Sequence, residues 1–163
     1  ESYGIQSGQV IDKPVELMDL MPTFLDAAGV DIPVTVDGES LVPLMKDESS
    51  AWRDFVHGEC CNVPSSNSGM QYVTDGKRKF AWFPGKDEEL FFDLEEDPQE
   101  VRNLSNDPDR AIEVATWRGH LIAQLGDRPE GFTDGEKLIE QDGPTAPVLT
   151  RVIEDAQASE VIE

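Results

Sequence analysis

Two ionisable side chains stand two residues apart in a segment whose composition is typical of a β-strand. They are His57 and Glu59, at the end of the expected strand Arg53–Glu59. Because side chains alternate between the two faces of a strand, this spacing puts both groups on one face. There they can bind a polar substrate from the edge of a sheet, or they can form a satisfied structural pair. The sequence leaves both alternatives open.

A dense basic cluster follows a predicted turn at Asp75-Gly76. It consists of Lys77, Arg78 and Lys79. Three neighbouring cations can bind an anionic substrate, with Lys77 as the candidate contact, or they can balance neighbouring carboxylates. Both interpretations fit the sequence.

Neither the cysteines nor the carboxylates form a recognisable catalytic or metal motif. Cys60 and Cys61 are adjacent, which disfavours a disulfide between them, and two thiols do not make a disulfide framework. His57 and His120 have no metal-ligand spacing to these cysteines. The carboxylates are spread as on a solvated surface rather than gathered as calcium ligands. We therefore expect no catalytic residue, metal ligand or cofactor within this chain.

The charge balance excludes several classes of partner. The chain has 163 residues, with 34 Asp and Glu against 13 Lys and Arg, so its formal net charge is −21. Such a surface repels the phosphates of nucleic acids and anionic membranes. There is also no run of about 18 apolar residues that would predict a membrane span, so we expect a soluble protein. The acidic excess indicates the cytoplasm of a salt-adapted organism, with an ordinary acidic protein as the alternative.

The order of the expected elements predicts an α+β fold. Four short strands joined by tight turns favour a four-stranded antiparallel sheet. A C-terminal helix from Pro108 to about Leu125 carries one apolar stripe, which predicts that it covers one face of the sheet. Three aromatic residues are expected in the core rather than as platforms for sugar rings: Trp52, Trp82 and Phe83. The strands are expected at Arg53–Glu59, Met70–Asp75, Arg78–Phe83 and Glu89–Leu94, a helical turn at Leu41–Lys46, and the stripe at Val114, Trp117, Leu121 and Leu125.

A further helix is expected near the N-terminus. Asp19 is a candidate N-cap, and Gly29 suits the position after the last turn. The helix between them is apolar on nearly every side, as in a buried helix, yet one sheet and one long helix leave little to bury it. We therefore expect it to pack on a missing partner domain, with Leu17, Met21 and Phe24 uncovered in this chain alone.

Several motifs, taken in order, resemble the segment that follows the catalytic half of sulfatases. They are Val15–Thr23, Ala28-Gly29, Asp37–Leu41, Phe55–Glu59, Val73–Phe80 and Leu90–Leu104. Their order and spacing extend the resemblance over residues 10–125. The chain is thus similar to the C-terminal region of an arylsulfatase-type sulfuric ester hydrolase of the alkaline-phosphatase-like superfamily.

The resemblance implies that the chemistry lies outside this chain. Sulfatases carry Cys or Ser in a C/S-x-P-x-R context that is converted to formylglycine, together with acidic and amide pairs that hold calcium. The corresponding stretch here, Cys61-Asn62-Val63-Pro64, is one residue too long before its proline and is not followed by the arginine. Formylglycine and Ca²⁺ are therefore implied for an intact enzyme, and this chain is predicted to be inactive alone.

The chain is expected to have three parts, of which the tail is inferred from its irregular sequence rather than from the resemblance. Residues 1–50 would link to the catalytic domain and pack on it, residues 51–126 would form the α+β subdomain, and residues 127–163 would form an extended tail with a helix near Val152–Ala158. Because the chain begins at Glu1 rather than at Met, we expect a processed product or a piece of a longer protein.

The predicted function is that of the C-terminal portion of a sulfatase, with a role at the substrate mouth and in stability. Its partners would be the catalytic domain, in the same or a separate chain, and a sulfated small molecule or glycan. One alternative is a stand-alone binding or scaffold module that docks on a catalytic partner. Another is a piece of a related phosphate or phosphonate ester hydrolase.

Overall fold

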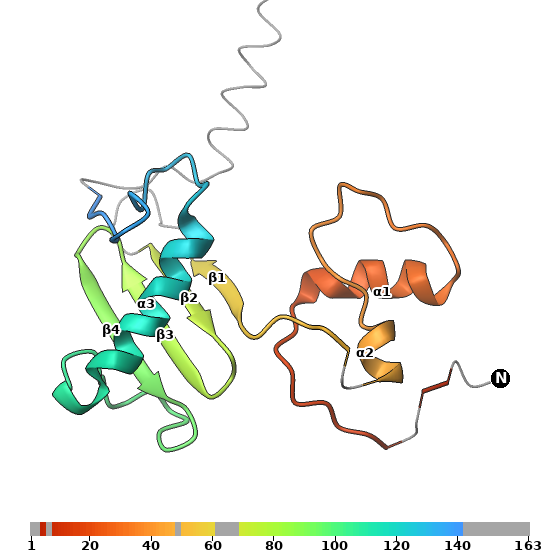
Figure 1. Ribbon diagram of the computed structural model, residues 1–163, viewed down its shortest axis with the longest axis horizontal. Coiled ribbons are helices and arrows are strands. Elements are labelled where there is room, and N and C mark those ends of the chain that lie inside the picture. The colour runs from red at the N-terminus through yellow and green to blue at the C-terminus, as the bar shows by residue number, and fades with distance from the viewer. Residues whose placement is uncertain (1–3, 6–7, 48–49, 61–68, 142–163) are drawn as a thin grey trace, which may run out of the picture. The chain divides into compact units, whose positions relative to one another are not determined.

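The chain folds into two compact units, Glu1–Val56 and His57–Glu163. The computed structural model describes residues 4–5, 8–47, 50–60 and 69–141 (Figure 1). The first unit holds two short helices, and the second is dominated by an antiparallel sheet with a long helix packed on it. This confirms the α+β class predicted from the sequence.

The first unit is built around α1 (Leu20–Ala27), which directly follows the 3-10 helix η1 (Leu17–Asp19). Gly29 closes this segment with a φ of 69°, a left-handed conformation that glycine adopts without steric penalty. The second helix, α2 (Val42–Lys46), has Pro43 in its first turn, where the missing N–H of proline is not needed. Both helices confirm the predicted segments.

Asp19 occupies the predicted N-cap position of α1, but its side chain does not cap that helix. It accepts from the backbone N–H of Glu16, as part of a capping box of η1, and from the guanidinium of Arg53. The reason is its complete burial, since a buried carboxylate needs a cation as well as backbone donors.

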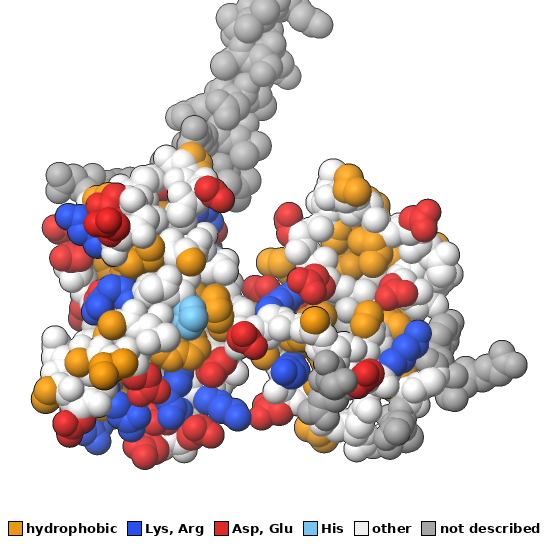
Figure 2. Space-filling view, viewed as in Figure 1, with side chains coloured by type: hydrophobic (Ala, Val, Ile, Leu, Met, Phe, Trp, Pro, Cys, Tyr) orange, Lys and Arg blue, Asp and Glu red, His pale blue; other side chains and the backbone are white. Residues whose placement is uncertain are grey.

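One flank of α1, together with Leu17 of the preceding η1, is uncovered, as predicted. The side chains of Leu17, Met21 and Phe24 are 86%, 51% and 67% exposed. The buried residues of the helix are Pro22 and Thr23. Figure 2 shows apolar side chains gathered on the surface of this unit. The helix therefore presents one apolar flank to solvent.

The sheet is a meander of four strands in the order β1-β2-β3-β4. The strands are β1 (Val56–Cys60), β2 (Met70–Thr74), β3 (Arg78–Phe83) and β4 (Glu88–Asp93). The antiparallel registers place Phe80 of β3 opposite Val73 of β2 and opposite Phe91 of β4. The β2–β3 turn forms because Asp75 accepts from two following backbone N–H groups and Gly76 adopts a φ of 88°. The strands differ from the predicted ones only at their ends.

The main core lies between the sheet and α3 (Ala111–Leu125), which follows the 3-10 helix η2 (Pro108–Arg110) (Figure 1). Asp107 caps this helical segment by accepting from Asp109 N–H at 3.0 Å, as predicted. The predicted apolar stripe is buried, and each large apolar side chain stabilises the fold by about 1.5–3 kcal/mol. The core includes Val73, Phe80, Trp82, Phe91, Val114, Trp117, Leu121 and Leu125.

The aromatic residues expected in the core differ in their burial. Trp82 is fully buried, whereas Trp52 and Phe83 are half-buried. Trp52 donates from its indole N–H to the carbonyl of Pro14 at 2.7 Å, so it ties two segments of the first unit together.

Residues 127–141 follow α3 and pack within the second unit. The ring of Phe132 is buried and meets Trp82 edge-on, with ring centroids 6.0 Å apart. Gln141 N–H donates to the carbonyl of Pro84 at 3.0 Å. The helix expected near Val152–Ala158 lies outside the described residues.

Candidate functional site

His57 and Glu59 point to the same glutamine of the neighbouring strand. Nε2 of His57 lies 2.8 Å from Oε1 of Gln71, and Nε2 of Gln71 donates to Glu59 at 3.1 Å. Gln71 is only 5% exposed. The structure therefore joins two of the predicted site residues through a buried third one. Sequence analysis missed Gln71 because the contact crosses between strands, and its register cannot be read from spacing alone.

The polar array continues to Arg128, which follows α3. Its guanidinium donates to Glu59 at 3.0 Å and to Glu130 at 2.8 Å. The hydrogen bond with Glu130 is the main cause that raises the pKa of Arg128, and attraction from Glu59 adds to it. Glu59 thus accepts from a permanent cation on one side and from the amide of Gln71 on the other.

Lys77 lies elsewhere, in the turn that joins β2 to β3, at the far end of β2 from the glutamine bridge. The two residues after it are in ion pairs. Arg78 contacts Asp93 at 2.9 Å, and Lys79 contacts Glu100 at 2.8 Å. For these two cations the structure supports the alternative in which the cluster balances neighbouring carboxylates. The array of His57 and Glu59 does not include this cluster.

The first unit contains a buried ion pair that sequence analysis did not identify. Two nitrogens of Arg53 donate to the two oxygens of Asp19 at 2.7 and 2.8 Å. The backbone N–H groups of Glu16 and Glu39 donate to the same carboxylate at 2.8 and 3.0 Å. Burial alone would raise the pKa of Asp19, but these hydrogen bonds outweigh it and lower the pKa below its ordinary value. The pair is a structural anchor for the loop that contains Glu39.

The motif Asp37–Leu41 holds that loop against α1 and η1. At Gly38 the backbone approaches so closely that an added Cβ would collide with the carbonyl oxygen of Met18. Leu41 N–H donates to the hydroxyl of Thr23 at 2.9 Å. This sulfatase-like motif therefore has a packing role in the structure.

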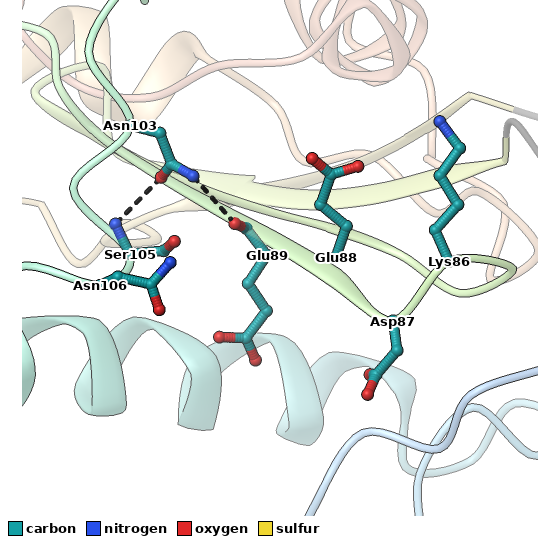
Figure 3. Close-up of a pocket in the computed structure, with 7 residues that line it drawn as sticks. All are labelled: Lys86, Asp87, Glu88, Glu89, Asn103, Ser105 and Asn106. Carbon is teal, nitrogen blue, oxygen red and sulfur yellow. Dashed lines mark hydrogen bonds between the residues drawn. The ribbon is translucent and has the colours of Figure 1, made fainter.

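A polar groove of about 550 Å³ opens beside the start of β4 (Figure 3). Asn103 forms one wall, where its side-chain oxygen accepts from Phe91 N–H at 3.0 Å and from Ser105 N–H at 2.9 Å. Its amide nitrogen donates to the carbonyl of Glu89 at 3.2 Å. These bonds fix the segment after β4 to the strand. The lining residues are Lys86, Asp87, Glu88, Glu89, Asn103, Ser105 and Asn106.

Within residues 4–5, 8–47, 50–60 and 69–141, no group of three or more His, Cys, Asp or Glu side chains could hold a metal ion. In the same ranges, no helix is both long enough and apolar enough to cross a membrane.

Comparison with known proteins assigns the chain to a family. The profile of the family described as "N-sulphoglucosamine sulphohydrolase, C-terminal" matches residues 2–125. The chain belongs to this family of sulfatase C-terminal domains. An arylsulfatase of Clostridium perfringens (strain 13 / Type A) is 43% identical over 82% of the chain and 27% of the relative. An N-acetylglucosamine-6-O-sulfatase of Bacteroides thetaiotaomicron is 29% identical over 73% of the chain and 22% of the relative. This sulfatase C-terminal domain thus spans about a quarter of these relatives.

Solved structures share the fold. The structure of BT4656 in complex with its substrate D-glucosamine-2-N,6-O-disulfate matches with a TM-score of 0.60 and 26% identity, over 66% of this chain and 23% of that one. The phosphonate monoester hydrolase of Silicibacter pomeroyi matches with a TM-score of 0.64 and 27% identity, over 76% of this chain and 27% of that one. The resemblance noted from the sequence motifs is therefore confirmed for this sulfatase C-terminal domain.

Proposed function

We propose that this domain is the C-terminal portion of an enzyme that hydrolyses sulfate esters. The observation that carries the proposal is the family match over residues 2–125, together with 43% identity to an arylsulfatase of which the chain spans 27%. The nucleophile and the metal would belong to the remaining part of that enzyme, which would carry formylglycine and Ca²⁺. The domain itself would stabilise the enzyme and form part of the wall at its substrate mouth.

The uncovered flank of α1 fits a catalytic domain as its partner. Leu17, Met21 and Phe24 are each more than half exposed, and contiguous apolar surface of this kind marks an interface. A catalytic domain of the same enzyme would cover the flank permanently, which removes the unfavourable contact of these side chains with water. The chain would then contribute stability through this interface rather than through chemistry.

His57 and Glu59 would lie at the substrate mouth. They stand on β1, which is one of the two edge strands of the sheet, so a ligand can approach them without displacing a neighbouring strand on that side. Gln71 and Arg128 hold both side chains in place through hydrogen bonds. A pre-positioned imidazole and carboxylate are suited to bind polar groups of a substrate.

The test compares the isolated chain with the longer enzyme that contains it. We expect the longer enzyme to hydrolyse an aryl sulfate and the isolated chain to show no turnover, with or without Ca²⁺, since sulfate ester cleavage needs a nucleophile and charge stabilisation. Saturable, calcium-dependent hydrolysis by the pure isolated chain would contradict the proposal. A longer protein that hydrolyses no sulfate ester would favour a binding or scaffold module.

A related ester hydrolase is the second candidate. It is supported by the match to a phosphonate monoester hydrolase at 27% identity, and by 28% identity to the multifunctional alkaline phosphatase superfamily protein PehA of Trinickia caryophylli. The same longer enzyme should be assayed with a phosphonate monoester. A larger kcat/KM for the phosphonate monoester than for the sulfate ester would favour this candidate.

A further inference from the structure

The contacts of the His57–Gln71–Glu59 array determine which side chain donates and which accepts each hydrogen bond. An ionised carboxylate only accepts hydrogen bonds, so Gln71 must present its NH₂ group to Glu59, at 3.1 Å. The amide oxygen of Gln71 then faces His57, 2.8 Å from Nε2. Because an amide oxygen also only accepts, Nε2 of His57 carries a proton.

The contact between Glu59 and Arg128, at the end of the array away from His57, stabilises this orientation of the Gln71 amide. The carboxylate oxygen of Glu59 that accepts from Gln71 also accepts from Arg128 at 3.0 Å, and a guanidinium is always a donor. Gln71 is 5% exposed, so little water is available to satisfy a flipped amide. A flip would bring two oxygens together in a poorly solvated place, which carries a large penalty.

We propose that Gln71 is a positioning residue that selects the Nε2–H tautomer for the neutral form of His57, so that Nδ1 is offered to the substrate as an acceptor. Among the described residues, no group forms a hydrogen bond to Nδ1 of His57. This inference rests on the proposed function, because it concerns the same substrate-facing side chains.

The tautomer selects the part of a substrate that His57 can bind. Sulfate oxygens only accept hydrogen bonds, so a sulfate monoester carries its donors on the alcohol part. Nδ1 of the neutral ring therefore matches a hydroxyl of that alcohol part. The substrate class is a sulfate ester that bears a further hydroxyl group.

The first test measures the tautomer directly by NMR of the isolated chain with ¹⁵N-labelled imidazoles, at a pH at which imidazole is neutral. The chain has two histidines, so His120 is an internal reference. We expect the Nε2–H form for His57 in the wild-type chain and a mixture of tautomers in Gln71→Leu. Glu59→Leu should also give a mixture, because it removes the acceptor that orients the amide of Gln71 and leaves Gln71 in place.

The matched control is Gln141→Leu, which removes a glutamine outside the array and should leave the His57 tautomer unchanged. Among the described residues, the side chain of Gln141 donates to two backbone carbonyls of its own segment, those of Gly131 and Ile139. An Nδ1–H signature in the wild-type chain would overturn the proposal. So would an unchanged tautomer in folded Gln71→Leu or folded Glu59→Leu.

The second test uses the longer enzyme and two sulfate esters. Gln71→Leu should lower kcat/KM for a hydroxyl-bearing sulfate ester about twofold more than for phenyl sulfate, because an equal mixture of tautomers leaves about half of the His57 side chains with Nδ1 as an acceptor. An equal loss on both esters would overturn the assignment of Nδ1 to a hydroxyl. If the wild-type enzyme hydrolyses neither ester, the proposed function fails, and the tautomer measurement still decides the role of Gln71.

Discussion

At the scale of residues, the buried carboxylates of this chain hold loops and strands in place. Asp19 accepts hydrogen bonds from Arg53 and from two backbone N–H groups. Asp93, at the end of β4, accepts from Arg78 at 2.9 Å and from Arg110 at 3.4 Å. Each carboxylate thus joins segments that are distant in sequence, and each depends on its cation because an unpaired buried charge is strongly destabilising.

Removal of the Arg53 cation should therefore destabilise the first unit. We expect Arg53→Met to lower the free energy of unfolding by about 3 kcal/mol, because Asp19 is left buried without its partner. The double variant Arg53→Met/Asp19→Leu should recover part of this loss. Denaturant unfolding measures both effects. Equal stability of Arg53→Met and the wild-type chain would show that the pair does not anchor the unit.

At the scale of elements, the strands and α3 could be predicted because local patterns determine them. Alternating polar and apolar residues and an Asp75-Gly76 turn define β2 and β3, and one apolar stripe defines α3. The roles of Asp19 and Gln71 depend on tertiary contacts instead, which local patterns do not reveal. Asp19 has the right position for a cap, but the distant Arg53 competes for its carboxylate, and Gln71 acquires its role only from the strand register.

The loop that packs on η1 gives a prediction at this scale. We expect Gly38→Ala to destabilise the chain by roughly 1–3 kcal/mol, because the new methyl group would collide with the backbone of Met18, which cannot move aside as a side chain would. Gly119→Ala is the matched control, since its Cβ would meet no atom within 4 Å in the middle of α3. It should stabilise the helix by roughly 0.5–1 kcal/mol. Thermal unfolding of both variants compares the two, and a harmless Gly38→Ala would contradict the close packing.

The flank of α1 gives a second prediction at this scale. The isolated chain should self-associate or bind a hydrophobic dye through Leu17, Met21 and Phe24, which are uncovered. Met21→Lys should reduce the association and leave the far-ultraviolet circular dichroism of the sheet unchanged. Val34→Lys adds the same charge at an exposed position in the following loop and is the control. If both variants reduced association equally, net charge rather than the flank would be responsible.

At the scale of the whole molecule, the main feature is the excess of negative charge. An excess of 21 negative charges remains after every cation is counted, although ion pairs such as Arg118–Glu89 and Arg78–Glu113 are distributed over the second unit. Those pairs are local, whereas the repulsion among the excess carboxylates acts over the full Debye length, about 30 Å at 0.01 M salt. The folded chain brings the charges closer together than the unfolded chain does, so the repulsion opposes folding.

Salt should therefore stabilise this chain. Raising KCl from about 0.01 M to 1 M shortens the Debye length from about 30 Å to about 3 Å, which removes most of the repulsion among the excess carboxylates. The same salt also weakens exposed ion pairs, but each of these contributes only about 0–1 kcal/mol, so the loss of repulsion should be the larger effect. We expect the Tm to rise steeply with KCl, and to rise equally with choline chloride at low ionic strength, because screening depends on ionic strength rather than on the cation. A flat or falling Tm would show that the acidic surface is not an adaptation to salt.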